Sequence, residues 1–211
     1  MAMPPPSNSP TSVAILAKAP IAGLAKTRLI PAIGAHAAAV LQERLTERAV
    51  TTALAANIGP VTLWCSPDST HSSFLQLVTR LRITLKPQPQ GDLGARMFAA
   101  TTASNGPVLV IGTDCPAMSE IHLRGAANAL SDGIDVILIP AEDGGYVLIG
   151  TRKAQPALFT DIAWGTKTVL AETRARIIAQ RLMLAEQPPL WDIDTESDLA
   201  RLEREFPEFK L

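Results

Sequence analysis

The stretch Val13–Leu29, VAILAKAPIAGLAKTRL, is the part of the chain that most strongly determines its expected fold. It opens with five small or apolar residues, a run that is typical of a buried strand. Three cations, Lys18, Lys26 and Arg28, then follow around Gly23, which allows a tight turn. A strand followed by a glycine-containing basic loop and a helix commonly binds phosphate in α/β proteins. A solvated basic turn is the alternative, since neither GxxxxGK[ST] nor GxGxxG is present.

The composition indicates one folded domain. The chain has 211 residues, of which 47% are hydrophobic and 18% are charged, so it can bury a sizeable core. Its formal net charge is −1, and the lack of a basic excess disfavours a nucleic-acid-binding protein. The sequence MAMPPPSNSP predicts a disordered tail over residues 1–12, followed by a single domain over residues 13–211.

Cysteine content and hydropathy bear on where the protein works. Cys65 and Cys115 each follow an apolar run, and free thiols in a reducing compartment explain them most simply. The N-terminus lacks the cationic start and apolar core of a signal peptide, and no apolar run reaches the roughly 18 residues of a membrane span. We therefore expect a cytoplasmic protein without membrane partners. The sequence leaves the oligomeric state open, with a homodimer as one option.

Apolar, β-branched runs alternate with helical stretches along the chain. The predicted strands are Val13–Ala17, Val61–Cys65, Arg82–Lys86, Val108–Gly112, Asp135–Pro140, Tyr146–Ile149 and Leu182–Ala185. The predicted helices are Ala35–Ala56, Ser69–Arg80, Leu93–Ala103, Ser119–Leu130, Thr166–Arg181 and Thr195–Phe206. This alternation predicts a three-layer α/β/α fold with a mostly parallel central sheet. Because only five residues separate Pro140 from Tyr146, one of the two strands they bound should run antiparallel.

Polar clusters follow four of the predicted strands, where the strands end. Ligands of open parallel sheets bind outside the carboxyl ends of the strands. The clusters should therefore meet at one edge of the sheet. They are Lys18–Arg28, Gln90–Arg96, Thr113–Pro116 and Glu142–Gly145.

The motif GTDCP, Gly112–Pro116, places Asp114 directly after the most apolar strand. A carboxylate at that edge commonly holds a divalent cation that bridges phosphate oxygens. The alternative is a structural turn, although Ser119 is the better N-cap for the next helix. Cys115 could act as a nucleophile, but no histidine has motif evidence for pairing with it, so a buried thiol is favoured.

The motif QGDLGARM, Gln90–Met97, is a glycine-containing turn that leads into a helix. Gly91 and Gly94 would let a flat ligand approach the backbone. Asp92 can instead cap the helix, which is the structural alternative. Arg96 sits in the first helical turn, where its charge opposes the macrodipole, so it could face an anion.

The motif EDGGY, Glu142–Tyr146, lies between two predicted strands. Asp-Gly is a strong signal for a tight hairpin, so Gly144 and Gly145 could serve the turn alone. A hairpin tip at the ligand edge can also contact a sugar through Asp143, and the two interpretations are compatible.

The segment WDIDTESDL, residues 191–199, carries three aspartates. Asp192 and Asp194 alternate, so they lie on one face of an extended chain. Either could complete a metal site with Asp114, since two carboxylates and substrate phosphates are typical Mg²⁺ ligands. Asp198 fits a capping box with Thr195 and is therefore expected to be structural.

The histidines and Trp164 have simpler explanations. His36, His71 and His122 fall on predicted helices without partner spacing, so we expect surface residues rather than ligands. Trp164 precedes a helix that Thr166 can cap, and it is most simply a core residue.

Taken in order, the motifs resemble those of the bacterial radical-SAM/selenodomain-associated transferase family, within the nucleotide-diphospho-sugar transferase superfamily, which has a GT-A-like fold. The resemblance extends from about Val13 to Leu202, with Gly165 in place of the expected serine. The phospholactate guanylyltransferases are more distantly similar, through their KPxxxAK[ST]RL-like loop, Asp-containing turn and DGG turn. The matching motifs are AKAPxxGxxKTRL, QGDLGxRM, GTDCP, PAEDGGYxLIG, WxTxxVL and DIDTxxDL.

The resemblance implies that the loop cations face nucleotide phosphates, that Asp114 binds metal, and that the residues from Gly91 to Gly94 lie near the base or ribose. It also places Asp143 to Gly145 near the transferred group or acceptor. Together with the motif analysis, the expected nucleotide site is Lys18, Gly23, Lys26, Arg28, Gly91, Asp92, Gly94 and Arg96. The expected acceptor site is Asp143, Gly144, Gly145 and Tyr146, and the expected Mg²⁺ (or Mn²⁺) ligands are Asp114, Asp192 and Asp194.

Two transfer chemistries fit these residues, with Lys26, Arg28 and Asp114 as the expected catalytic groups. In nucleotidyl transfer, a small phosphorylated acceptor attacks a nucleoside triphosphate and pyrophosphate leaves; the basic loop favours this reaction. In glycosyl transfer, a sugar leaves a nucleotide diphosphate, which fits the resembled superfamily. A non-catalytic nucleotide-binding protein is the third hypothesis.

Overall fold

The computed structural model of the protein describes residues 10–210. Most of the tail expected over residues 1–12 therefore lies outside the described residues. Thr11 is buried and its N–H donates to Ile58 O at 3.0 Å. Since Ser12 already belongs to the first strand, the ordered domain begins before Val13.

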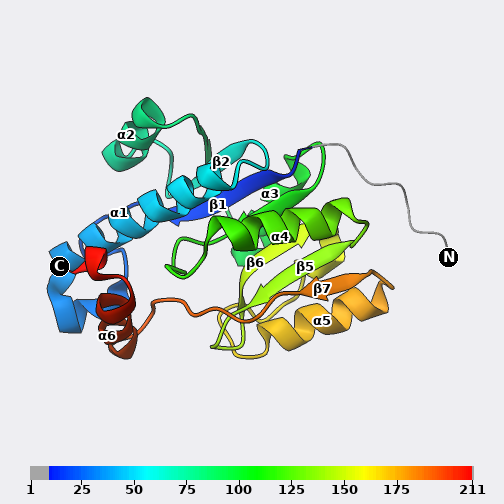
Figure 1. The fold of residues 1–211 in the computed structure, drawn as a ribbon. Helices are drawn as coiled ribbons and strands as arrows, with labels where there is room; N and C mark the ends of the chain where they lie inside the picture. Colours follow the sequence, from blue (N-terminus) through cyan, green and yellow to red (C-terminus); the bar gives the residue numbers. More distant parts are fainter. Residues whose placement is uncertain (1–9, 211) are drawn as a thin grey trace.

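A seven-stranded sheet forms the middle layer, in the order β3-β2-β1-β4-β6-β5-β7 (Figure 1). Its strands pair in parallel except that β6 runs antiparallel to both β4 and β5. The predicted antiparallel strand is therefore confirmed, and the short connection before it forms a hairpin. The strands are β1 (Ser12–Lys18), β2 (Val61–Ser66), β3 (Thr84–Pro87), β4 (Val108–Ile111), β5 (Val136–Pro140), β6 (Tyr146–Thr151) and β7 (Leu184–Glu186).

Helices cover both faces of the sheet, which confirms the predicted three-layer architecture (Figure 1). One apolar core lies between the sheet and α1, α2 and α4, and a second lies between the sheet and α3 and α5. A third cluster joins the start of α1 to α6 near the C-terminus. The helices are α1 (Ile30–Ala56), α2 (Ser72–Arg80), α3 (Leu93–Thr102), α4 (Glu120–Ser131), α5 (Val169–Ala179) and α6 (Glu196–Glu205), with 3-10 turns at Thr27–Leu29, Pro156–Leu158 and Pro207–Phe209.

The predicted elements are all present, and the main differences lie at helix starts. α1 begins at Ile30 rather than Ala35, because the chain turns helical before Gly34, whose φ of 79° then kinks the helix. α5 begins at Val169 rather than Thr166, so the segment that carries Trp164 is irregular. No helix within residues 10–210 has the length and hydropathy needed to cross a membrane.

Two of the histidines serve helix starts. His71 Nδ1 accepts the N–H of Ser73 at the start of α2. His122 completes a capping box with Ser119 at the start of α4. The expectation of surface residues therefore needs correction for these two half-buried rings, since unpaired N–H groups at a helix start require acceptors. His36 is exposed.

Candidate active site

A cleft of about 480 Å³ opens at the edge of the sheet where β1, β2 and β4 end. All the predicted motif segments reach it, as expected for the carboxyl edge of a parallel sheet. The expected site residues that line it are Lys18, Lys26, Arg28, Arg96, Asp114, Asp143, Gly145, Tyr146, Asp192 and Asp194. Among the described residues, those that were expected but do not line it are Gly23, Gly91, Asp92, Gly94 and Gly144.

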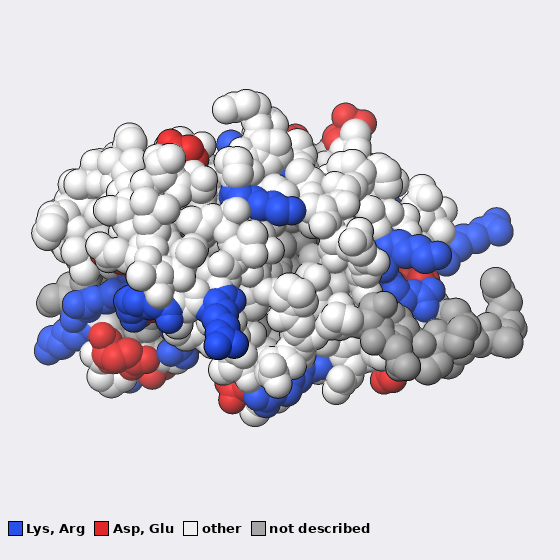
Figure 2. Space-filling view, turned by 90° about the horizontal axis from the view of Figure 1, so that it is seen from above, with Lys and Arg blue, Asp and Glu red and all other residues white. Residues whose placement is uncertain are grey.

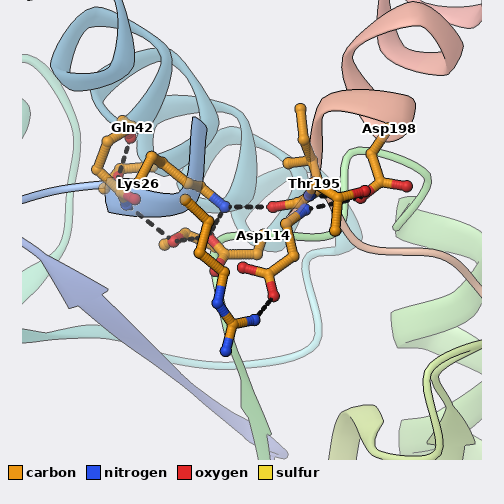
Figure 3. A network of polar contacts seen from close by, with 10 residues as sticks. Lys26, Gln42, Asp114, Thr195 and Asp198 are labelled. Carbon is orange, nitrogen blue, oxygen red and sulfur yellow. Dashed lines mark hydrogen bonds and ion pairs between the residues drawn. The ribbon is translucent and has the colours of Figure 1, made fainter. Parts of the chain in front are cut away.

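Lys26 is the central connection of the site (Figure 3). Its side chain is only 4% exposed, and its Nζ lies 2.8 Å from Asp114 Oδ1. The same ammonium donates to the carbonyl oxygen of Ile193 at 2.7 Å, and the N–H of Ile193 donates to Asp114 O at 2.8 Å. Lys26 thus joins the loop after β1, the Asp114 carboxylate and the segment before α6. Its predicted contact with phosphate stays a prediction.

Arg28 and Asp194 form a second pair across the same boundary, but at the surface. The Arg28 side chain is 71% exposed, so its guanidinium can turn toward a ligand without breaking a buried contact. Asp194 already has a cationic partner in this pair. Of the two predicted late metal ligands, Asp194 is therefore the less available.

Asp192 lies among like charges. Burial, together with the nearby carboxylates of Asp143, Asp114 and Asp194, raises its pKa to about 6. No Lys or Arg side chain within residues 10–210 pairs with it. This crowding of hard oxygen donors would be relieved by a divalent cation, so the donor set fits Mg²⁺ or Mn²⁺.

The protein would supply only part of such a coordination sphere. Within the described residues, no group of three or more Asp, Glu, His or Cys side chains is arranged so that it could hold a metal ion. That is the ordinary condition of Mg²⁺ sites, in which water and substrate phosphates complete the octahedron. Asp114 and Asp192 are the side chains that could supply the protein's share.

Opposite effects on stability are expected from two aspartates of this segment. The pKa of Asp192 is about 6 in the folded protein, against 3.8 in an ordinary peptide. Above about pH 6 the charged carboxylate therefore destabilises the folded state. This loss of stability disappears as the pH falls toward 3.8, the pKa of the unfolded chain. Asp192→Asn should therefore raise the free energy of unfolding of the metal-free protein by about 1 kcal/mol at about pH 7.5, after allowance for solvent screening. The gain should shrink at about pH 4.5.

Asp198 provides the contrast. Burial raises the pKa of Asp198, but hydrogen bonds from Asp194 N, Thr195 N and the Thr195 hydroxyl outweigh it and hold the pKa below its usual value. Asp198→Ala should lower the free energy of unfolding by about 1 kcal/mol, as loss of a cap does. Urea denaturation of both variants tests this pair. An Asp192→Asn gain that persisted unchanged at low pH would show that charge is not its cause.

The glycines before and within α3 have structural roles. Asp92 caps α3 by accepting the N–H of Ala95 at 2.8 Å. This is the structural role that was the alternative to ligand binding. A Cβ added at Gly94 would lie 2.1 Å from Phe159 O and 2.7 Å from Trp164 Nε1. The close approach predicted for a ligand at Gly94 is therefore made by the chain itself, and it fixes Trp164 against α3. Gly91 has a φ of 122° and Gly23 a φ of 84°, so both shape turns.

Gly94→Ala should destabilise the protein although alanine normally favours a helix. The added methyl group has to displace the Phe159 carbonyl and the Trp164 ring, which we expect to cost about 1–3 kcal/mol of unfolding free energy. Gly112→Ala is the matched control, because a Cβ there would meet nothing closer than Asp114 N at 4.0 Å. Equal stability of the two variants in thermal denaturation would contradict this packing role.

The hairpin between β5 and β6 contributes another part of the cleft lining. Asp143 Oδ1 accepts the N–H of Gly145 at 2.9 Å, which stabilises the turn and leaves Asp143 exposed at the cleft. A Cβ on Gly144 would lie 2.4 Å from Lys167 O, so Gly144 packs against the segment after Trp164 instead of facing a ligand. Burial raises the pKa of Tyr146 well above its usual value, so its hydroxyl stays neutral.

Residues outside the predicted site also line the cleft, among them Gln42, Ser66, Gln88, Trp164 and Thr166. Gln88 Nε2 donates to Ala17 O and Trp64 O, and its Oε1 accepts from Arg96 Nη1 at 3.4 Å. It therefore ties the ends of β1 and β2 to the first turn of α3. Trp164 is half-buried: it packs against the core, as predicted, and it also lines the cleft. The only signal in the sequence that could have indicated Gln88 is its position directly after a strand, because ligands bind outside the carboxyl ends of parallel strands.

The thiol of Cys115 also lines the cleft. Burial is the main cause that raises its pKa to about 12. A thiol that stays protonated at neutral pH is a poor nucleophile. The prediction of an inert thiol is thereby supported.

Surface charge is distributed in small groups. Seen from above, Lys and Arg side chains form separate small groups, some of them beside Asp or Glu, with uncharged surface between the groups (Figure 2). The described residues of this face form no continuous basic stripe of the kind that follows a phosphate backbone.

Comparison with known proteins identifies the family of this chain. A family model described as "uncharacterized protein conserved in bacteria" matches residues 49–166, more than half of the chain. The chain belongs to the DUF2064 family. A search of curated proteins found no significant match to this chain.

Solved structures share the fold of this DUF2064 protein. A candidate nucleotide-diphospho-sugar transferase from Desulfovibrio desulfuricans G20 is 28% identical, with a TM-score of 0.84 over 92% of this chain and 87% of that chain. A nucleotidyl transferase from Methanothermobacter thermautotrophicus is 16% identical, with a TM-score of 0.66 over 97% and 100% of the two chains. A Mycobacterium tuberculosis H37Rv protein in complex with manganese is 14% identical, with a TM-score of 0.55 over 92% and 98%.

These likenesses confirm the GT-A-like fold and the nucleotide-diphospho-sugar transferase superfamily. The narrower resemblances, to radical-SAM-associated transferases and to phospholactate guanylyltransferases, stay predictions.

Proposed function

We propose that this protein is a Mg²⁺- or Mn²⁺-dependent transferase that moves a nucleotidyl group from a nucleoside triphosphate to a small phosphorylated acceptor. One observation carries the proposal: Lys18 at the end of β1, Arg28 from the loop that follows and Arg96 from α3 line the same cleft as the carboxylates of Asp114 and Asp192. Opposite charges so arranged suit a substrate that is held both directly and through a metal ion. The fold shared with a nucleotidyl transferase supports it.

The residues then have distinct roles. Lys18 and Arg96 bind phosphate oxygens, because neither is engaged by a carboxylate within residues 10–210. Arg28 joins them when it leaves Asp194. Asp114 and Asp192 would hold the metal, which when bound neutralises phosphate charge that develops as pyrophosphate departs. Lys26 also lines the cleft, but its ammonium is engaged by Asp114 and Ile193, so its role is to keep Asp114 in place.

Glycosyl transfer from a nucleotide-diphospho-sugar is the second candidate. Its support is the 28% identical protein described as a candidate transferase of that class. The exposed Asp143 at the cleft favours it as well, since a carboxylate can accept hydrogen bonds from sugar hydroxyls.

Binding and product analysis separate these candidates. A thermal-shift screen of nucleoside triphosphates and nucleotide-diphospho-sugars, with Mg²⁺ and with a chelator, should show metal-dependent stabilisation by a triphosphate. Lys18→Met and Arg96→Met should weaken triphosphate binding more than nucleoside binding, whereas Lys153→Met, on an exposed residue outside the cleft, should not. Release of pyrophosphate from the bound nucleotide supports nucleotidyl transfer, and release of nucleoside diphosphate supports glycosyl transfer. Stabilisation by neither class contradicts both.

A further inference from the structure

Gln42 is a polar side chain in the buried face of α1, with only 3% of its surface exposed. Its neighbours on that face, Leu41 and Leu45, are fully apolar and pack into the cluster that joins α1 to α6. A buried amide is costly unless its hydrogen bonds are made. Gln42 makes two: its Nε2 donates to the hydroxyl of Thr46 at 3.2 Å and to the hydroxyl of Thr113 at 3.0 Å.

The direction of these bonds is fixed by the protons available. The Thr46 hydroxyl donates its one proton to the carbonyl oxygen of Gln42 at 2.8 Å, so the group that faces it from the amide must be a donor. That group is Nε2, and its second N–H points to Thr113. Since the Thr113 oxygen accepts this bond, its own proton is left to donate to Asp114 Oδ1 at 3.1 Å.

Asp114 Oδ1 therefore receives two donors, Thr113 and Lys26, from opposite parts of the chain (Figure 3). No hydrogen bond within residues 10–210 falls on Oδ2 of the same carboxylate. Two bonds to one oxygen hold the carboxylate plane and leave the other oxygen for a further ligand. Outer partners of this kind orient the groups that bind a metal.

We infer that Gln42 is a positioning residue that orients Asp114 for metal binding through Thr113. The inference rests on the proposed metal site. It assigns to the middle of α1 a role in the chemistry that no motif of the sequence indicates. The chain of bonds runs from a helix core through one hydroxyl to the carboxylate, so it transmits the rigidity of α1 to the site.

Mn²⁺ alone is the probe, titrated into the full-length protein and followed by the electron paramagnetic resonance of the free ion. Gln42→Met keeps the length of the side chain and removes both donors, and Thr113→Val keeps the shape and removes the hydroxyl. Each should weaken Mn²⁺ binding about 10–100-fold, the range for outer-shell partners. Thr113→Ser, which keeps the hydroxyl, should retain the affinity of the unmodified protein.

The double variant decides whether Gln42 acts through Thr113. With Thr113→Val in place, Gln42→Met should cause no further loss, because the connection is already broken. Thr46→Val is the matched control: it removes the other hydroxyl bound by the same amide and leaves the branch to Asp114. It should lower the melting temperature as the other variants do, but leave Mn²⁺ affinity unchanged.

The outcomes are distinguishable. Unchanged Mn²⁺ affinity in Gln42→Met, additive losses in the double variant, or an equal loss in Thr46→Val would overturn the positioning role. Asp114→Asn serves as the reference. If it binds Mn²⁺ as the unmodified protein does, or if that protein binds Mn²⁺ neither alone nor together with a nucleoside triphosphate, the metal site itself is wrong and the inference falls with it.

Discussion

Asp114→Asn is expected to abolish metal-dependent nucleotide binding while the protein stays folded. Asparagine keeps the shape of the side chain and can still accept hydrogen bonds from Thr113 and Lys26, which both contact Oδ1. It removes the charge that a divalent cation requires of a hard oxygen ligand. Because outer-shell partners alone cost 10–100-fold in metal affinity, the loss of a ligand should exceed about 100-fold. Calorimetric titration of Mg²⁺ with nucleotide measures this loss.

Asp92→Asn is the control for this prediction. It also removes a carboxylate next to the cleft, but Asp92 does not line the cleft, and an asparagine can still cap α3. Equal losses in the two variants would point to general electrostatics instead of coordination. Full Mg²⁺-dependent affinity in Asp114→Asn would remove Asp114 from the metal site.

Lys26→Met should have the largest effect on stability among the cationic residues of the cleft. The substitution keeps the aliphatic stem and the left-handed backbone of Lys26, whose φ is 47°. It leaves the Asp114 carboxylate without its ion pair and Ile193 O without its donor. Breaking a buried charge pair costs about 3–5 kcal/mol, but Asp114 is 49% exposed and regains water. We therefore expect about 2 kcal/mol less unfolding free energy.

Arg28→Met is the matched control, since Arg28 comes from the same loop and pairs with Asp194 at the surface. An exposed pair contributes about 0–1 kcal/mol, so its loss should be small. Chemical denaturation of both variants gives the comparison. If Arg28→Met proved as destabilising as Lys26→Met, burial would not be what distinguishes the two pairs.

Much of the fold follows from local sequence. Continuous apolar runs such as that of β4 can be satisfied only in a strand with both faces covered, and the caps at Asp92, Ser119 and Thr195 mark three helix starts. The kink of α1 at Gly34 was not predicted, because glycine tolerates both helical and left-handed backbone and only packing selects between them.

In the candidate site, too, some features follow from the sequence and others only from the tertiary structure. The sequence alone predicts that Lys18–Arg28, Gln90–Arg96, Thr113–Pro116 and Glu142–Gly145 follow strands and therefore share an edge of the sheet. It does not determine which charges meet. Only tertiary structure buries Lys26 against Asp114, places Gln42 behind Thr113 and packs Gly94 against Trp164. Partners 71 residues apart, such as Gln42 and Thr113, are brought together by the packing of α1 on the sheet, which no local pattern encodes.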